Sequence, residues 1–236
     1  MTGTSDDRAV GAVAARALDL IEDGATVGLG SGQAAAAFIA RLAERVRAGL
    51  RVAGVPTSEA TARQARDLGI PLVGLDENLE LDLTIDGADE VAPNLDLVKG
   101  WGGALVRERI VAAASRRQVI LVGHDKLVRA LGERGRIPVE VIPFAQGPAM
   151  RRLRALALRP VLRTSPDGAR PTITENGNLL LDCAPSEVLR DGSAARALDA
   201  MLRAIPGVVD TGLFLGTAER VLVGYPDGRV DVLGGR

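Results

Sequence analysis

Three carboxylates crowd together in the segment Asp86-Gly87-Ala88-Asp89-Glu90, directly after an apolar run. Like charges at this spacing repel each other with energies on the kcal/mol scale, which Asn or Ser in a simple turn would avoid. An Asx turn or a helix cap would explain one of the acids and leave the others unexplained. We therefore expect this segment to bind or act on a ligand.

A lysine followed by glycines forms a second candidate, Lys99-Gly100-Trp101-Gly102-Gly103. Lys99 and Lys126 are the only lysines, although Lys and Arg together number 29. Chance survival is one explanation; the other is that the compact ammonium group does what the broad guanidinium group of arginine cannot. A lysine beside glycine amides suits the stabilisation of an oxyanion, and Lys126, in the loop Gly123-His124-Asp125-Lys126, suits a phosphate contact.

Glu108 is the candidate for a general base. It shares a helical stripe with apolar residues at spacings of three and four, namely Ala104, Leu105, Val111 and Ala112. Desolvation on such a face raises the pKa of a carboxylate toward the range that is useful for proton transfer. An ion pair with a neighbouring arginine would explain the position equally well.

A glycine-rich turn, Gly28-Leu29-Gly30-Ser31-Gly32-Gln33-Ala34, joins an apolar run to a helical pattern. The backbone N–H groups of Ser31, Gly32, Gln33 and Ala34 would face an anion such as a phosphate. The segment lacks the third glycine of the dinucleotide-binding fingerprint and the Gly-Lys-Ser/Thr of a P-loop. A tight strand-to-helix corner without a ligand explains the pattern about equally well.

Composition excludes several classes of function. Acidic and basic residues number 30 and 29 and aromatics are 2%, which leaves neither a basic field nor a stacking platform for nucleic acid. The only histidine is His124 and the only cysteine is Cys183, which supports neither a metal site nor a disulfide. No apolar run reaches bilayer length, and Met1–Arg8 lacks a secretory signal pattern. We expect a cytoplasmic protein without metal or cofactor and without a membrane or nucleic-acid partner.

The elements that position these residues alternate between strand and helix in the first half of the chain. Apolar runs predict strands at 25–29, 51–55, 70–75, 81–85 and 118–122, and helical spacing predicts helices at 34–47, 59–68 and 103–115. This alternation predicts a parallel sheet with helices on both faces. Ligands bind outside the carboxyl ends of the strands in such sheets, where we expect the candidate loops.

The order of elements changes from residue 137 onward. The pattern predicts a strand at 138–142, a helix at 148–157, strands at 160–164 and 178–183, a helix at 194–204 and a strand at 208–213. This β-α-β-β-α-β order is typical of a ferredoxin-like unit, and a final hairpin at 220–225 and 229–233 would return to the first domain. The sequence therefore predicts an α/β fold: a Rossmann-like parallel sheet domain of residues 1–132 plus 214–236, and a smaller ferredoxin-like α+β lid domain of residues 133–213.

Taken together, the motifs resemble the type A ribose-5-phosphate isomerases. The Asp-Gly-Ala-Asp-Glu segment, then Lys-Gly-x-Gly-Gly-Ala-Leu, then a helix with Arg-Glu-Arg form a highly specific order, and the resemblance covers nearly the whole chain. It implies an aldose–ketose isomerase of the non-oxidative pentose phosphate branch, which interconverts ribose 5-phosphate and ribulose 5-phosphate through an enediolate. It also implies metal independence and a homodimer or homotetramer.

The resemblance assigns a role to each candidate residue. Glu108 would move a proton between C1 and C2 of the opened sugar, and Lys99 with the following loop would stabilise the oxyanion. Asp86 and Asp89 would bind hydroxyls and assist ring opening. The remaining substrate contacts would come from Gly87, Ala88, Gly100, Trp101, Gly102, Lys126 and the turn Ser31-Gly32-Gln33-Ala34.

Three positions depart from the family's pattern. Its phosphate loop usually ends Thr-Gly-Ser-Thr, whereas Ser31-Gly32-Gln33-Ala34 lacks two of these hydroxyls. A lysine frequent near the N-terminus is matched by Asp7 or Arg8, and the usual Asp-x-Ser-Lys becomes Gly123-His124-Asp125-Lys126. The reaction type is therefore better supported than the affinity for the substrate.

Two alternatives remain open at this point. One is an isomerase of another sugar phosphate, which turnover of a panel of pentose and hexose phosphates would reveal. The other is a non-catalytic sugar-phosphate sensor on the same scaffold. Sensing would not require Glu108, so its presence favours the enzyme.

Overall fold

The computed structural model describes residues 5–77 and 79–235, which form two compact units. The first unit comprises Met1–Ala88, Arg107–Lys126 and Gly216–Arg236, and the second comprises Asp89–Val106 and Leu127–Leu215. The chain therefore passes between the units four times. Segments 89–106, 127–132 and 214–215 fall in the second unit, whereas the sequence placed them in the first domain. The domain bounds predicted from the sequence stay a prediction.

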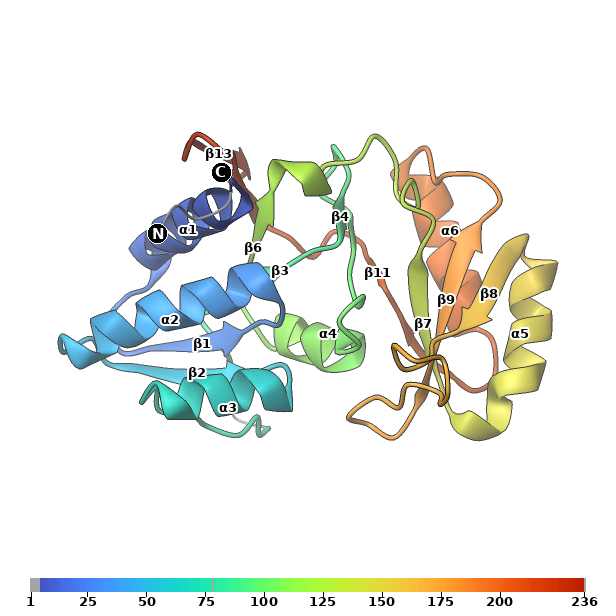
Figure 1. Ribbon diagram of the computed structural model, residues 1–236, viewed down its shortest axis with the longest axis horizontal. Coiled ribbons are helices and arrows are strands. Elements are labelled where there is room, and N and C mark those ends of the chain that lie inside the picture. Colours follow the sequence, from blue (N-terminus) through green and yellow to red (C-terminus); the bar gives the residue numbers. More distant parts are fainter. Residues whose placement is uncertain (1–4, 78, 236) are drawn as a thin grey trace. The chain divides into compact units, whose positions relative to one another are not determined.

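The first unit is built on a six-stranded sheet with the order β13-β12-β6-β3-β1-β2. Figure 1 labels all of these strands except β12. Neighbouring strands from β2 to β12 run parallel, and β13 is antiparallel to β12. The bounds are β1 Ala25–Leu29, β2 Val52–Pro56, β3 Leu83–Gly87, β6 Gln118–Gly123, β12 Arg220–Gly224 and β13 Val230–Gly234. This confirms the predicted parallel sheet and its closing hairpin.

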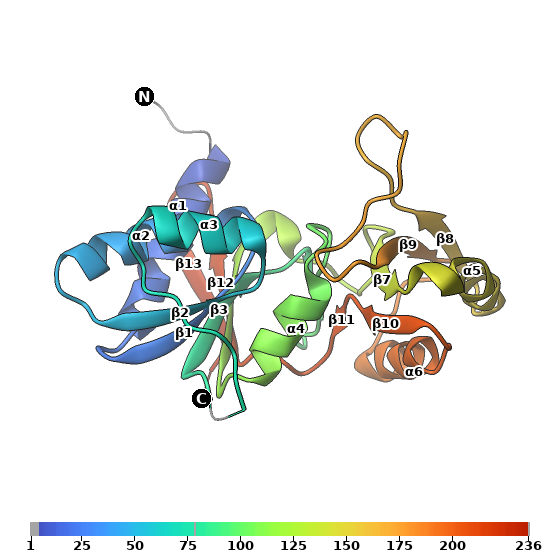
Figure 2. The ribbon, with the colours of Figure 1, turned by 90° about the horizontal axis from the view of Figure 1, so that it is seen from below.

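Helices cover both faces of this sheet (Figure 2). Their bounds are α1 Ser5–Ala17, α2 Gln33–Arg47, α3 Glu59–Asp67 and α4 Leu105–Ala113. Buried side chains of α1, α2 and α3 share one apolar core with Val27 and Leu29 of β1. Val111 of α4 lies on the other face, where it packs with Val55 and Leu81. The period-two alternation of the strands thus directs successive residues to opposite layers.

The segment predicted as a strand at 70–75 is wrong. It forms only an isolated parallel bridge between Leu72 and Gly54. Pro71 has no amide hydrogen for a ladder, and Gly74 adds no side chain to pack, so the run cannot continue as a regular strand. Helix α1 was not predicted at all, although Val13 and Ala14 are completely buried in the core.

The second unit contains a four-stranded antiparallel sheet with the order β10-β7-β9-β8, whose strands are labelled in Figure 2. Chain order is β7 Ile137–Val141, α5 Gln146–Ala155, β8 Leu158–Leu162, β9 Leu179–Pro185, α6 Gly192–Arg203 and β10 Val208–Thr211. Leu153 of α5 and Leu202 of α6 are fully buried against Val139 and Leu181 of the central strands. The predicted ferredoxin-like arrangement is therefore confirmed.

A small three-stranded sheet in the second unit was not predicted. It has the order β11-β5-β4, with β4 Glu90–Val91, β5 Leu97–Val98 and β11 Leu213–Phe214. The remaining regular elements are short 3₁₀ turns at Leu18–Leu20, His124–Lys126 and Pro143–Ala145. None of the helices formed by the described residues is both long and apolar enough to span a bilayer.

Candidate functional site

The glycine-rich turn of the first unit lies between β1 and the first turn of α2. Gly32 has a φ of 92°, a conformation that residues with a Cβ rarely adopt, and α2 begins at the next residue. Gly30 packs against Asp86 so closely that an added Cβ would lie 2.1 Å from the carboxylate Oδ1. Glycine is therefore required at both positions, one for conformation and one for close packing.

Asp86 lies near the end of β3 and is completely buried. Its Oδ1 accepts the amide N–H of Ser31 at 3.1 Å and that of Gly87 at 2.7 Å. Gly87 and Ala88, which follow it, are half-buried. The carboxylate thus joins the ends of β1 and β3 in one polar layer, and one of its roles is to order the turn at Ser31.

A cluster of hydroxyl groups surrounds Ser31 and was not predicted as part of a site. The Ser31 Oγ lies 2.8 Å from Thr57 Oγ1, 2.9 Å from Ser58 Oγ and 3.3 Å from Thr61 Oγ1. Thr57 and Ser58 follow β2, and Ser58 caps α3 by accepting the Thr61 amide. The pair of hydroxyl residues after a parallel strand was the signal available in the sequence.

The first turn of α2 supplies the other residues predicted to meet a phosphate. Gln33 is exposed and Ala34 is half-buried, and no side chain caps the helix. The first amide N–H groups of a helix have no partner within the helix and carry the positive end of its dipole. This helix end can therefore bind an anion without the side-chain hydroxyls that the family's pattern usually supplies.

Lys126 ends a 3₁₀ turn directly after β6. Its side chain is 34% exposed, and its ammonium group lies 3.3 Å from Asp125 Oδ2. An exposed pair of this kind is weak, so the lysine can exchange its partner for another anion at little cost. His124 in the same turn stacks on Tyr225 at 5.4 Å between ring centroids, which favours a packing role.

Glu108 lies in α4 and is 5% exposed. Leu105 and Val111, one turn away on either side, are 0% and 4% exposed, so the expected apolar stripe is present. Arg107, the preceding residue, has its guanidinium group 3.3 Å from Glu59. A buried carboxylate with apolar neighbours along its helix has the environment of a proton-transfer base.

Lys99 of the second unit follows β5 and is 2% exposed. Its backbone amide donates to Gly212 O at 2.9 Å, and its ammonium group lies 5.5 Å from the centre of the Phe214 ring. A charge buried to this extent interacts far more strongly than one in water. Lys99 therefore has the environment that an electrostatic catalyst requires.

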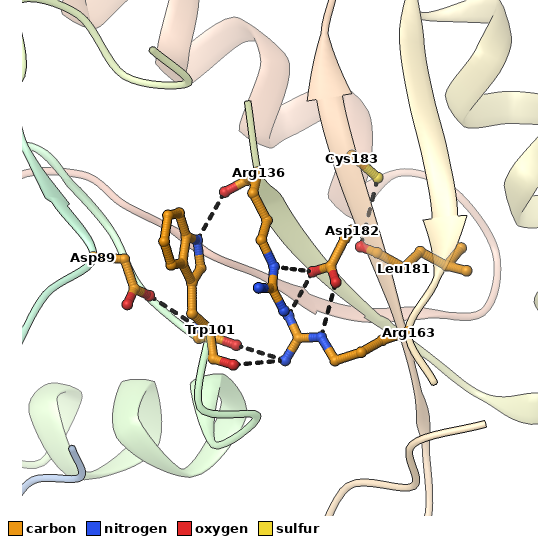
Figure 3. Close-up of polar contacts among 8 residues, drawn as sticks. Asp89, Trp101, Arg136, Arg163, Leu181, Asp182 and Cys183 are labelled. Carbon is orange, nitrogen blue, oxygen red and sulfur yellow. Dashed lines mark hydrogen bonds and ion pairs between the residues drawn. The ribbon is translucent and has the colours of Figure 1, made fainter. Parts of the chain in front are cut away.

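The residues Lys99–Gly103 are called the oxyanion loop below. The Trp101 amide donates to Asp89 Oδ2 at 2.9 Å, and its indole Nε1 donates to Arg136 O at 3.0 Å (Figure 3). The Gly103 amide donates back to Gly100 O at 3.0 Å and closes a tight turn before α4. The structure thus brings Asp89 together with the oxyanion loop.

Cys183 is fully buried in β9, and burial raises the pKa of its thiol to about 12. The thiol stays protonated at neutral pH and has no nucleophilic role. Among the described residues, no group of three or more His, Cys, Asp or Glu side chains could hold a metal ion.

The fold and these residues define the class of the protein. It is an α/β protein with one Rossmann-like unit and one ferredoxin-like unit, and it contains buried carboxylates and a buried lysine. The family model described as ribose 5-phosphate isomerase A (phosphoriboisomerase A) matches residues 53–228. The chain belongs to this family, which confirms the resemblance found in the sequence.

Relatives and solved structures agree with this assignment. The chain is 50% identical to ribose-5-phosphate isomerase A of Roseiflexus castenholzii over 93% of this chain and 92% of the relative. It is also 50% identical to that of Gloeobacter violaceus over 93% of both chains. The structure of the isomerase from Methanocaldococcus jannaschii has a TM-score of 0.89 at 40% identity, covering 97% of this chain and 99% of that one. A D-ribose-5-phosphate isomerase in complex with phospho-erythronic acid has a TM-score of 0.92 at 35% identity, covering 98% and 99%.

Proposed function

We propose that this chain interconverts ribose 5-phosphate and ribulose 5-phosphate by proton transfer through an enediolate. Membership of the family and the names of its relatives support this activity. The observation that carries the proposal is the presence of two deeply buried charged residues, Glu108 at 5% exposure and Lys99 at 2%. Charges held in such surroundings interact strongly with charge that develops beside them, and proton transfer next to a carbonyl uses both a carboxylate and an ammonium group.

In this mechanism Glu108 is the base. Its carboxylate takes the proton from C2 of the open-chain aldose, and the electron pair of that bond forms the C1–C2 double bond while charge moves to the carbonyl oxygen at C1. The protonated Glu108 then returns the proton to C1. A proton moves from the C2 hydroxyl to the C1 oxygen, so the ketose forms with no net gain or loss of atoms.

Lys99 and the oxyanion loop stabilise the charge that develops on the oxygen atoms. A buried ammonium group needs little reorganisation when the enediolate forms, and the amide N–H groups of Gly100 and Gly102 provide neighbouring donors; the Trp101 N–H donates to Asp89 instead. Asp86 and Asp89 bind sugar hydroxyls and assist ring opening, together with the backbone of the residues that join them, Gly87 and Ala88. These roles are the ones that the family resemblance implies, and the burial and contacts described above support them.

The phosphate end of the substrate is assigned to the turn Ser31-Gly32-Gln33-Ala34 and to Lys126. The helix end supplies backbone donors and a partial positive charge. Gln33 adds a side-chain amide with two N–H donors. Because these donors differ from those of the usual family pattern, the affinity for the phosphate is the property in which this chain should differ from its relatives.

The proposed setting is the cytoplasm, and the proposed assembly is a homodimer or homotetramer, as the family resemblance implies. The enzyme is proposed to need no metal ion or other cofactor, since a carboxylate base and an ammonium group suffice for the reaction. The substrate is the only small-molecule partner proposed.

The decisive experiment measures ketose formation from ribose 5-phosphate after dialysis against a chelator. Turnover that survives the chelator supports the proposal, and a requirement for added metal ion would overturn the metal-independent mechanism. A parallel panel of pentose and hexose phosphates tests the alternative substrate: a higher kcat/KM for another sugar phosphate would replace ribose 5-phosphate in the proposal.

A further inference from the structure

Arg163, which directly follows β8, binds the oxyanion loop although the two lie far apart in the sequence. This set of hydrogen bonds is called the grip of Arg163 below. Its Nη1 donates to Gly100 O at 3.1 Å and to Trp101 O at 3.0 Å (Figure 3). The Arg163 side chain is 10% exposed, so these bonds are largely shielded from water. One guanidinium group thus holds two consecutive carbonyl groups of the loop.

Asp182 of β9 anchors Arg163 on the side away from the loop. The Arg163 Nε donates to Asp182 Oδ2 at 2.9 Å, and Nη2 donates to Oδ1 of the same carboxylate. Arg136 adds an ion pair of 3.0 Å to Oδ1. Burial raises the pKa of Asp182, but hydrogen bonds from Arg163 and Arg136 outweigh this and hold that pKa below its usual value. The carboxylate is therefore ionised at neutral pH and fixes the plane of the Arg163 guanidinium.

This grip determines the direction of two amide groups. In a trans peptide unit the C=O and the following N–H point to opposite sides, and no described peptide bond is cis. Because the carbonyl groups of Gly100 and Trp101 face Arg163, the N–H groups of Trp101 and Gly102 face the other way. The Trp101 N–H accordingly reaches Asp89, and the Gly102 N–H points to the same side of the loop.

We propose that Arg163, anchored by Asp182, is a positioning residue that holds the oxyanion loop in its working conformation. It orders Asp89 through the Trp101 amide and turns the Gly102 amide to the side on which Asp89 lies. The inference rests on the proposed function, because only the isomerase reaction gives this loop an oxyanion to stabilise. Lysine cannot replace Arg163. The planar guanidinium group donates to two carbonyl oxygens and, through a second pair of N–H groups, to a carboxylate, which an ammonium group cannot do at the same time.

The kinetic test compares Arg163→Lys with a matched control. Arg159→Lys makes the same change at an exposed position of β8. We expect Arg163→Lys to lower kcat roughly 10- to 100-fold, as small misplacements of catalytic groups do, with KM changed less than about threefold. Arg159→Lys should keep kcat within about threefold of the wild type.

Binding of phospho-erythronic acid distinguishes a positioning role of Arg163 from general damage to the protein. Its carboxylate resembles the charged end of the enediolate, so its inhibition constant should rise in Arg163→Lys by the same factor by which kcat/KM falls. Asp182→Asn, which keeps the shape of the side chain, provides a second variant should Arg163→Lys fail to fold. It should lower kcat in the same direction, and combining the two substitutions should cost no more than the more damaging one alone.

Trp101 is the only tryptophan in the chain and reports on the loop without any substrate. In Arg163→Lys its fluorescence should become more accessible to acrylamide, and in Arg159→Lys it should not change. If the wild type fails to isomerise ribose 5-phosphate, the proposed function fails, while the fluorescence still tests the grip. The positioning role is overturned if Arg163→Lys keeps wild-type kcat, if its loss lies in KM alone, or if the Trp101 signal does not change.

Discussion

Replacing Glu108 with glutamine tests the assignment of the base with little disturbance of the fold. The two side chains have nearly the same shape, so the packing along the stripe with Leu105 and Val111 should be retained. Glu108 is 5% exposed, and neutral glutamine is less costly to bury than a carboxylate. We therefore expect the thermal midpoint of Glu108→Gln to stay within about 4 °C of the wild type, which corresponds to less than about 1–2 kcal/mol for a chain of this size.

The activity should respond very differently. Loss of a general base removes a factor of roughly 10²–10⁴, so the activation free energy should rise by about 2.7–5.5 kcal/mol. The whole effect should appear in kcat, because glutamine can still contact the sugar and KM should change less than about threefold. A continuous assay of ketulose formation measures both constants.

Isotope exchange provides the sharper measurement of the same change. A base that moves the proton between carbons exchanges part of it with solvent, so wild-type enzyme in deuterium oxide should place deuterium in the sugar. Glu108→Gln should place none at a comparable conversion. Glu59→Gln is the matched control, because Glu59 is 55% exposed and pairs only weakly with Arg107. More than a tenth of wild-type turnover in folded Glu108→Gln would refute the assignment.

Three further sets of substitutions test other parts of the site and the fold. Lys99→Arg should lower kcat, because the wider cation does not fit a position that is 2% exposed. Lys126→Arg should alter mainly KM, since a guanidinium group binds phosphate well. Equal, small effects of the two substitutions in a steady-state assay would contradict both roles. Replacing Gln33 with Ser and Ala34 with Thr should change KM more than kcat, because each hydroxyl bond gained contributes up to about 1.5–3 kcal/mol to the free energy of binding. Both the wild type and this variant should prefer ribose 5-phosphate to ribose. Comparable kcat/KM values for ribose and its phosphate would contradict the phosphate assignment. Burial raises the pKa of Glu90 despite hydrogen bonds from the backbone amides of Arg134 and Gly132. The folded protein therefore binds a proton at Glu90 more tightly than the unfolded chain does. The stability of the wild type falls as pH rises from the usual pKa of Glu90 through the raised one. The free energy of unfolding of the wild type minus that of Glu90→Gln, both from urea titrations, should therefore fall as pH rises from the usual pKa of Glu90 through the raised one; a difference that is constant or increases over this range would contradict this.

Much of the layered fold could be predicted because its signals are local. The strand at Ala25–Leu29 has the bounds expected from the sequence, and the β-α-β-β-α-β order follows from period and turn residues. The small sheet could not be predicted in this way. Its strands contain two residues each, which is too short for a period, and Leu213 pairs with Val98 from a distant part of the chain.

The site shows the same division between local and non-local information. The apolar stripe of Glu108 and the scarcity of lysine can be seen in the sequence alone. The grip of Arg163 on Trp101 cannot, because it depends on the pairing of β8 with β9, which places Arg163 beside Asp182. The hydroxyl group of Thr61 likewise reaches Ser31 only once two separate strands have been laid side by side.

The position of β12 has a consequence for how the chain is synthesised. This strand is made about a hundred residues after β6, yet it pairs with β6 along residues 119–123. Until β12 leaves the ribosome, the apolar edge of β6, Gln118-Val119-Ile120-Leu121-Val122, has open backbone groups on one side. Open edges of this kind recruit other strands and lead to aggregation. The first unit therefore completes its sheet only once residues 220–224 are available to pair, and chains shortened before residue 220 should accumulate as insoluble protein.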